Sequence, residues 1–143
     1  MASYCTKYVF IYLKHVLMCN RLSRGASPHS VDLDGNTPLH CVLHSNYDSG
    51  PETKRNIARL LLNFGADPRT QNTNERNNAL HTLLQNAACS EMDLWLAFYI
   101  CEYLPNSAAI SSLLQAKNAD GLTPYGVPLM IFLSTFYLFT CTC

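Results

Sequence analysis

The sequence is poor in charged residues. Asp, Glu, Lys and Arg make up 14% of its 143 residues, whereas about a quarter is usual in soluble domains. Ten acidic and ten basic side chains leave no formal net charge. A neutral chain exerts no long-range attraction on a polyanion, so nucleic acid is not expected as a partner. Neutrality also weakens the electrostatic repulsion that keeps copies of a protein apart.

The short signatures of catalysis are also missing. The sequence contains no P-loop, no G-x-S-x-G, no paired-glycine dinucleotide motif and no C-x-x-C, so we do not expect an enzyme. His40 and His44 lie four residues apart with Cys41 between them, and zinc proteins use that spacing. Because no second pair of ligands at metal spacing accompanies them, we expect no metal site and no cofactor.

No apolar stretch has the length of a secretion signal or a membrane span. Residues 8–13 are apolar, but Lys14 and His15 end the run. Residues 129–143 carry no charge, yet they fall short of the roughly 20 residues that cross a bilayer. We therefore expect this tail to pack on the rest of the chain, or to drive self-association, rather than to enter a membrane. Seven scattered cysteines without a signal favour the cytoplasm, with the nucleus as an alternative.

Two motifs recur along the chain at nearly the same interval. The first is GASP at residues 25–28, which returns 40 residues later as GADP at 65–68. The second is DGNTPLH at residues 34–40; it returns in altered form as NNALH at 77–81 and as DGLTPY at 120–125. Two independent signals with one period of about 40 residues predict a protein built from repeated units.

The unit that starts near residue 31 predicts a turn followed by a helix. Gly35 supplies the positive φ that a tight turn needs. Thr37 is a suitable N-cap, and Pro38 then falls at the first helical position, where a missing N–H costs nothing. Two apolar side chains four residues apart lie on one face of that helix, Leu39 and Leu43.

A second helix is predicted over residues 54–63, with Thr53 as its cap. Gly65 follows as the residue that ends the helix in a left-handed conformation. Apolar residues spaced by three and four positions define its buried face: Ile57, Leu60, Leu61 and Phe64.

The next unit repeats this pattern less regularly. Ser90 opens a second helix in a capping-box-like sequence, residues 94–104 continue it, and Pro105 stops it. Residues 107–115 predict a short additional helix before the next turn. The first helix of the unit buries Leu80, Leu83 and Leu84, and we expect the second to bury three aromatic side chains, Trp95, Phe98 and Tyr99.

The motifs at 34–40 and 65–68, with the apolar helix between them, resemble the ankyrin-repeat family. The resemblance extends over about residues 20–127 and implies an all-α fold, a short ankyrin-repeat solenoid of stacked helix-turn-helix units. It divides the chain into a partial, irregular N-terminal repeat (1–30), an ankyrin-repeat region (31–127) and an apolar, atypical C-terminal tail (128–143). Pro128 falls inside the helix that Thr123 would cap, where proline costs roughly 3 kcal/mol.

Arg76 departs from the family pattern, because it stands where the turn glycine is expected. A residue other than glycine with positive φ costs about 1 kcal/mol. We therefore expect this turn to be distorted or longer than the others.

The resemblance implies that the protein is an interaction module or adaptor that binds another protein through its turn tips and the exposed side of its first helices. Two alternatives stay open: a tail-anchored membrane adaptor, and a truncated form of a larger ankyrin-repeat protein without independent activity. Carried over position by position, the partner-binding residues are Leu33, Asp34, Asn36, His44, Ser45, Asn74, Glu75, Asn77, Gln85, Asn86, Ala119, Asp120 and Leu122.

Overall fold

A computed structural model describes residues 19–44, 51–85 and 91–124 of the chain. All regular structure in these ranges is helical, as the all-α prediction requires. Residues 19–23 are helical, and the named helices follow in the order α2 (Pro38–Leu43), α3 (Pro51–Asn63), α4 (Ala79–Leu84), α5 (Glu91–Tyr103) and α6 (Ser107–Gln115). The predictions for Ser45, Asn86, Pro128, residues 1–18 and the tail lie outside the described residues.

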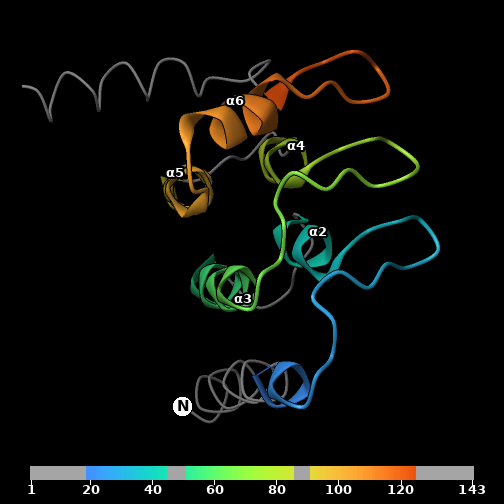
Figure 1. Ribbon diagram of the computed structural model, residues 1–143. Helices are drawn as coiled ribbons and strands as arrows, with labels where there is room; N and C mark the ends of the chain where they lie inside the picture. The colour runs from blue at the N-terminus through green and yellow to red at the C-terminus, as the bar shows by residue number, and fades with distance from the viewer. Residues whose placement is uncertain (1–18, 45–50, 86–90, 125–143) are drawn as a thin grey trace, which may run out of the picture.

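The helices stack in two layers. The short helices α2 and α4 pack on each other, the long helices α3 and α5 pack on each other, and each short helix packs on the long helix that follows it. The loops before α2 and α4 extend to the side away from α3 and α5, and the loop after α6 extends the same way (Figure 1). This arrangement confirms the predicted solenoid of helix-turn-helix units.

The short helices begin where the sequence predicts. Thr37 is the N-cap of α2, with extended backbone, and Pro38 is the first helical residue. Asn78 caps α4, and its side chain accepts the N–H of His81 at 3.1 Å. Asparagine at this position therefore preserves the cap although the Thr-Pro pair is missing.

Helix α3 starts earlier than predicted. It begins at Pro51, so Thr53 lies inside its first turn, buried, rather than at its cap. The proline explains the difference, because its fixed φ suits the first turn of a helix. The end of the helix is as predicted, since Gly65 follows it with a φ of 90°.

The core runs continuously between the layers. The predicted apolar faces of α2, α3 and α4 lie in it, apart from Leu60, which is half-buried, and Phe64, which is 43% exposed. Phe64 follows the last residue of α3 and lies outside the buried stripe of the helix. The side chains that are less than 2% exposed include Leu39, Leu43, Ile57, Leu61, Leu80, Leu83, Leu96, Ile100 and Leu113.

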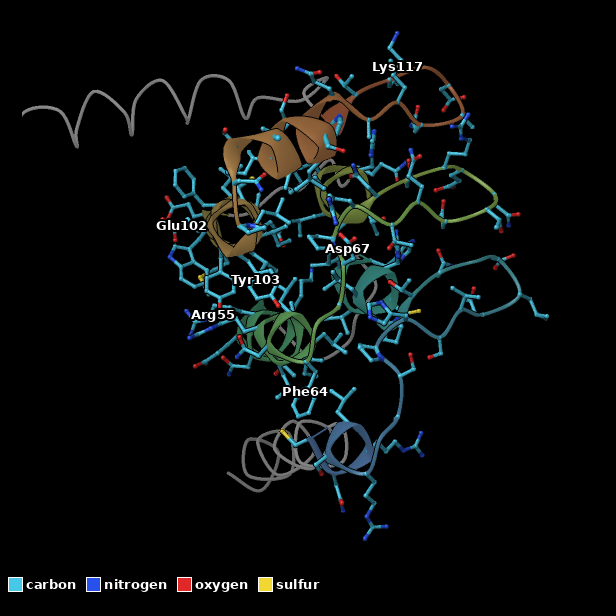
Figure 2. All side chains as sticks on the ribbon, in the orientation of Figure 1. Arg55, Phe64, Asp67, Glu102, Tyr103 and Lys117 are labelled. Carbon is cyan, nitrogen blue, oxygen red and sulfur yellow. The ribbon has the colours of Figure 1, made fainter. Side chains whose placement is uncertain are left out.

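Of the three aromatic residues predicted to lie in the core, Trp95 does not, while Phe98 and Tyr99 are half-buried. Trp95 is 44% exposed, and Tyr99 is half-buried and stacks on it with 5.6 Å between ring centroids. The guanidinium groups of Arg55 and Arg59 lie 5.2 Å from the Trp95 and Tyr99 rings. These cations lie over the rings from α3. Trp95 therefore lies at the outer surface, near Arg55 and Tyr103 (Figure 2), whereas Tyr99 also packs against the core.

Helix α6 confirms the predicted additional helix. Its cap is Asn106, whose side chain accepts the N–H of Ala109 at 2.8 Å. The carbonyl of Leu113 in turn accepts the side-chain N–H of Asn78 at 2.8 Å. That bond joins α6 to the start of α4, and the helix lies above α4 in the stack (Figure 1).

Candidate functional site

Each finger-like loop is closed by an Asp or Asn side chain at its base. Asp32 accepts the N–H groups of Asp34 and Asn36 at 3.0 and 2.8 Å. Asn118 accepts those of Asp120 and Leu122 at 3.1 and 2.9 Å in the last loop. These bonds hold the two arms of each loop together, as in an Asx turn.

The middle loop keeps this design with one extra residue. Asn72 donates its N–H to Asn77 O at 2.9 Å and accepts the N–H of Asn77 at 2.9 Å. The corresponding backbone bond in the first loop joins Asp32 to Asn36, which are one residue closer in sequence. Arg76 takes the place of the turn glycine with a φ of 53°. The prediction of a longer turn is therefore confirmed.

Neighbouring loops are bonded to each other. The N–H of Thr73 donates to Asp34 O at 3.1 Å, and the N–H of Ala119 donates to Glu75 O at 2.8 Å. The side chain of Asn72 donates to Asn36 Oδ1 at 2.9 Å. Because each loop is bonded to the next, the loop backbones are joined to one another.

Two buried histidines connect the short helices to these loops. His40 Nε2 lies 2.9 Å from Asn77 O, and His81 Nε2 lies 3.0 Å from Leu122 O. The N–H of Thr37 donates to Nδ1 of His40 at 3.3 Å, so the proton of a neutral His40 belongs on Nε2. Burial lowers the pKa of both imidazoles. The interpretation of His40 and His81 as structural residues agrees with these bonds.

A cavity of about 350 Å³ lies between the first two loops and the helices α2 and α4. It is lined by residues from both loops and from both helices. Six of them are among the predicted partner-binding residues: Asp34, Asn36, His44, Asn74, Glu75 and Gln85. The fold thus brings predicted residues that lie up to 51 positions apart in the sequence, Asp34 and Gln85, around one cavity.

Sequence reasoning missed four further residues of the cavity: His40, Cys41, Asn72 and Thr82. A signal for two of them existed, because Cys41 and Thr82 directly follow the two histidines of the repeated motif. Partial burial raises the pKa of the Cys41 thiol, so this group stays protonated at neutral pH.

The remaining predicted contact residues lie elsewhere. Leu33, Ala119, Asp120 and Leu122 are exposed on the first and last loops. The prediction that Asn77 contacts a partner is wrong, because this residue is only 1% exposed. Its side chain donates to Glu75 and accepts from Asn118. A partner cannot reach that amide in this structure. The equivalent residues of the other two loops, Asn36 and Leu122, are less buried, so their positions do not predict the burial of Asn77.

Charge in the cavity comes from two carboxylates. Asp34 Oδ1 accepts the side-chain N–H of Asn74 at 2.8 Å, and Glu75 Oε2 accepts that of Asn77. The lining contains no lysine or arginine. Asp32, at the base of the first loop, does not line the cavity; the N–H of Asn36 holds the pKa of its carboxyl under the usual value. The site therefore presents oxygen acceptors and negative charge.

Within the described ranges, no group of three or more His, Cys, Asp or Glu side chains could hold a metal ion. In the same part of the chain, no helix is both long and apolar enough to cross a bilayer.

Stacked helix-turn-helix units with hydrogen-bonded loops on one side define a helical repeat protein. A family model described as ankyrin repeat matches residues 34–73. A protein of Rickettsia felis (strain ATCC VR-1525 / URRWXCal2), described as a putative ankyrin repeat protein, is 39% identical over 51 residues. That segment covers 36% of this chain and 22% of the relative. Residues 34–73 thus match an ankyrin repeat, and the chain is similar to ankyrin-repeat proteins over that segment.

Proposed function

We propose that the protein binds another protein through the cavity between its first two loops and the helices α2 and α4. Ankyrin repeats are generally protein-interaction modules. The observation that carries this assignment is the convergence of six predicted contact residues on one cavity. Its volume, about 350 Å³, lies within the range typical of small binding pockets and suits a side chain or a short segment rather than a whole domain.

The partner that suits this cavity supplies hydrogen-bond donors and positive charge. Asp34 and Glu75 offer carboxylate oxygens, and the lining provides no basic side chain to neutralise them. A lysine or arginine side chain placed between them would form charge-assisted hydrogen bonds, which are about twice as strong as neutral ones. We infer a partner segment that inserts a basic side chain here.

The loops favour binding because they are ordered before a partner arrives. Asp34 is tied through its backbone oxygen to Thr73 and through its side chain to Asn74. Loss of side-chain freedom on binding costs about 0.5–1.5 kcal/mol for each mobile residue. The bonds between the loops reduce that cost for the residues around the cavity.

The test is selection of peptides on the full chain. A phage-displayed library of random peptides is selected on the immobilised protein, and the affinity of the selected peptides is measured. We expect peptides rich in Lys or Arg, whose binding weakens more than tenfold when Asp34→Asn is combined with Glu75→Gln, as expected for the loss of one or two charged contacts. Both changes remove charge and keep an oxygen acceptor.

Glu102→Gln is the matched control. Glu102 is exposed on α5, away from the loops (Figure 2), so its change should leave binding intact. If the affinity of the selected peptides is unchanged in the double variant Asp34→Asn with Glu75→Gln but falls in Glu102→Gln, the binding surface lies on the outer helices. Circular dichroism of each variant shows that the fold is retained.

A further inference from the structure

The turns at residues 25–30 and 65–70 have the same backbone structure. Gly25 and Gly65 both have a φ of 90°. Their N–H groups donate to the carbonyls of Leu22 and Leu62 at 3.0 and 2.9 Å, so both turns close on the preceding helix in the same way. Equivalent positions in the two turns are 40 residues apart.

The two turns differ at the residue before the proline, where the second has Asp67 and the first has Ser27. Asp67 Oδ1 accepts the N–H of Arg69 at 2.9 Å, and Oδ2 pairs with the Arg69 guanidinium at 2.8 Å. Ser27 Oγ accepts the N–H of His29 at 3.2 Å. Ser27 therefore keeps the backbone contact of Asp67 but lacks its charge, and His29 stands where Arg69 forms the ion pair.

The surroundings of Ser27 suit an enzyme that phosphorylates serine. Ser27 is exposed, and Arg24, also exposed, precedes it by three residues. Kinases select substrates partly by such charge patterns. Two neighbouring serines lack this arrangement, because Ser23 follows Asn20 at that spacing and Ser30 follows Ser27 itself.

Hydrogen bonding distinguishes these serines as well. The hydroxyl groups of Ser23 and Ser30 donate to the carbonyls of Asn20 and Ser27 at 3.0 and 3.1 Å. The Ser27 hydroxyl oxygen accepts the N–H of His29, and among the described residues its proton makes no hydrogen bond like those of Ser23 and Ser30. That proton has to leave when the oxygen is phosphorylated.

We propose that Ser27 is a phosphorylation site for a serine kinase that selects arginine three residues before its target and accepts proline after it. The Ser27 Oγ bonds to the γ-phosphorus of ATP, and the bond from that phosphorus to the β,γ-bridging oxygen breaks. ADP leaves with the electron pair, and the hydroxyl proton passes to the aspartate base of the kinase.

Phosphoserine at position 27 would give the first turn the anion that Asp67 supplies in the second. A phosphate carries about −1.5 to −2 charges at neutral pH and three acceptor oxygens. It can accept the N–H of His29 and pair with its ring, as Asp67 does with Arg69. The hydrogen bond from Arg69 is the main cause of the lowered pKa of Asp67, and the charge of His29 acts in the same direction. Repulsion between the two anions limits the gain, so we expect the melting temperature to rise by only a few degrees.

The experiment incubates the folded full chain with ATP and a purified kinase of this selectivity, and mass spectrometry locates the phosphate. We expect one phosphate on Ser27. Ser27→Ala should abolish it, Arg24→Ala should slow it at least tenfold, and Ser23→Ala and Ser30→Ala should leave the rate unchanged. A synthetic peptide of residues 19–33 shows that the kinase is active.

Phosphorylation of the peptide but not of the folded chain would overturn the proposal, because the turn would then shield Ser27. An unchanged rate of phosphorylation in Arg24→Ala would also overturn it. The melting temperature supplies a second readout: the phosphorylated chain should melt above the unmodified one, and the difference should shrink in His29→Ala. A lower melting temperature after phosphorylation would contradict the likeness to Asp67.

Discussion

The imidazole Nε2 of His40 lies 2.9 Å from the carbonyl oxygen of Asn77, thirty-seven residues further along the chain. His81 contacts Leu122 in the same way at 3.0 Å. Each histidine extends from a short helix to the loop of the following repeat, so one side chain joins two units. Neighbouring repeats hold a solenoid together, and these contacts are polar links between them.

We expect His40→Ala to lower the free energy of unfolding by about 1–3 kcal/mol, because it leaves a buried carbonyl without its donor. His44→Ala is the control, since His44 is exposed at the end of α2. Urea unfolding followed by circular dichroism measures both. Equal effects of the two changes would show that the bond to Asn77 contributes nothing.

Stability should also depend on pH through these two histidines. Burial lowers the pKa of His40 and His81 from 6.5, against the opposing effect of their bonds to Asn77 and Leu122. The unfolded chain therefore takes up protons at a higher pH than the folded one. Their contribution is fully present above pH 6.5 and is lost as the pH falls through the folded values.

The measurement is the urea midpoint at several pH values between about 7.5 and 5, above the range in which the carboxylates titrate. We expect the midpoint to fall with pH in the original chain. In the double variant His40→Gln with His81→Gln the decline should be smaller. A midpoint that is independent of pH in the original chain would mean that neither imidazole titrates differently on unfolding.

The repeat frame could be predicted from the sequence because local chemistry determines it. Thr37 and Pro38 begin α2 whatever surrounds them, and Gly65 ends α3 because a left-handed residue is needed there. The spacing of Leu80, Leu83 and Leu84 likewise fixes one face of α4. In these places propensity, capping and apolar pattern agree, so no tertiary information was needed.

The loops and the outer surface could not be predicted so well, because contacts between repeats determine them. Nothing in the sequence marks Asp32 and Asn118 as loop-closing residues, because their bonds to the loop N–H groups form only in the folded chain. Asn77 points inward, where its side chain bonds to Glu75 and to Asn118 of the next loop. Trp95 is 44% exposed, and its ring contacts Arg55 of α3, which lies forty residues earlier in the sequence.

Gly35 is required because the next loop approaches it closely, which the sequence alone does not show. Its φ is 75°, and a Cβ atom there would lie 2.7 Å from the backbone nitrogen of Thr73 in the next loop. Gly121 has the same φ, but nothing lies within 4 Å of its Cβ position. We expect Gly121→Ala to cost about 1 kcal/mol, the price of positive φ alone.

Gly35→Ala should cost clearly more than Gly121→Ala, because the clash with Thr73 adds to the backbone strain and separates the two loops. Urea unfolding of both variants gives the comparison, and peptide binding at the cavity should weaken only for Gly35→Ala. Equal losses of stability would show that the loops move apart without cost, and that their mutual bonds do not hold the site.

Arg76 offers the opposite change, since it adopts a φ of 53° where the other two loops have glycine. Replacement by glycine removes the strain of a left-handed residue, worth about 1 kcal/mol or more, and part of that gain is lost to the greater freedom of the unfolded chain. We expect Arg76→Gly to raise the free energy of unfolding by roughly 0.5–1 kcal/mol.

Arg76→Ala is the matched control, because it removes the same side chain and keeps the strain. The backbone carbonyl of Arg76, which accepts a bond from Gln71 at 2.7 Å, is unchanged in both variants. If Arg76→Ala stabilised the protein as much as Arg76→Gly, the arginine side chain and not the backbone conformation would be the source of the strain.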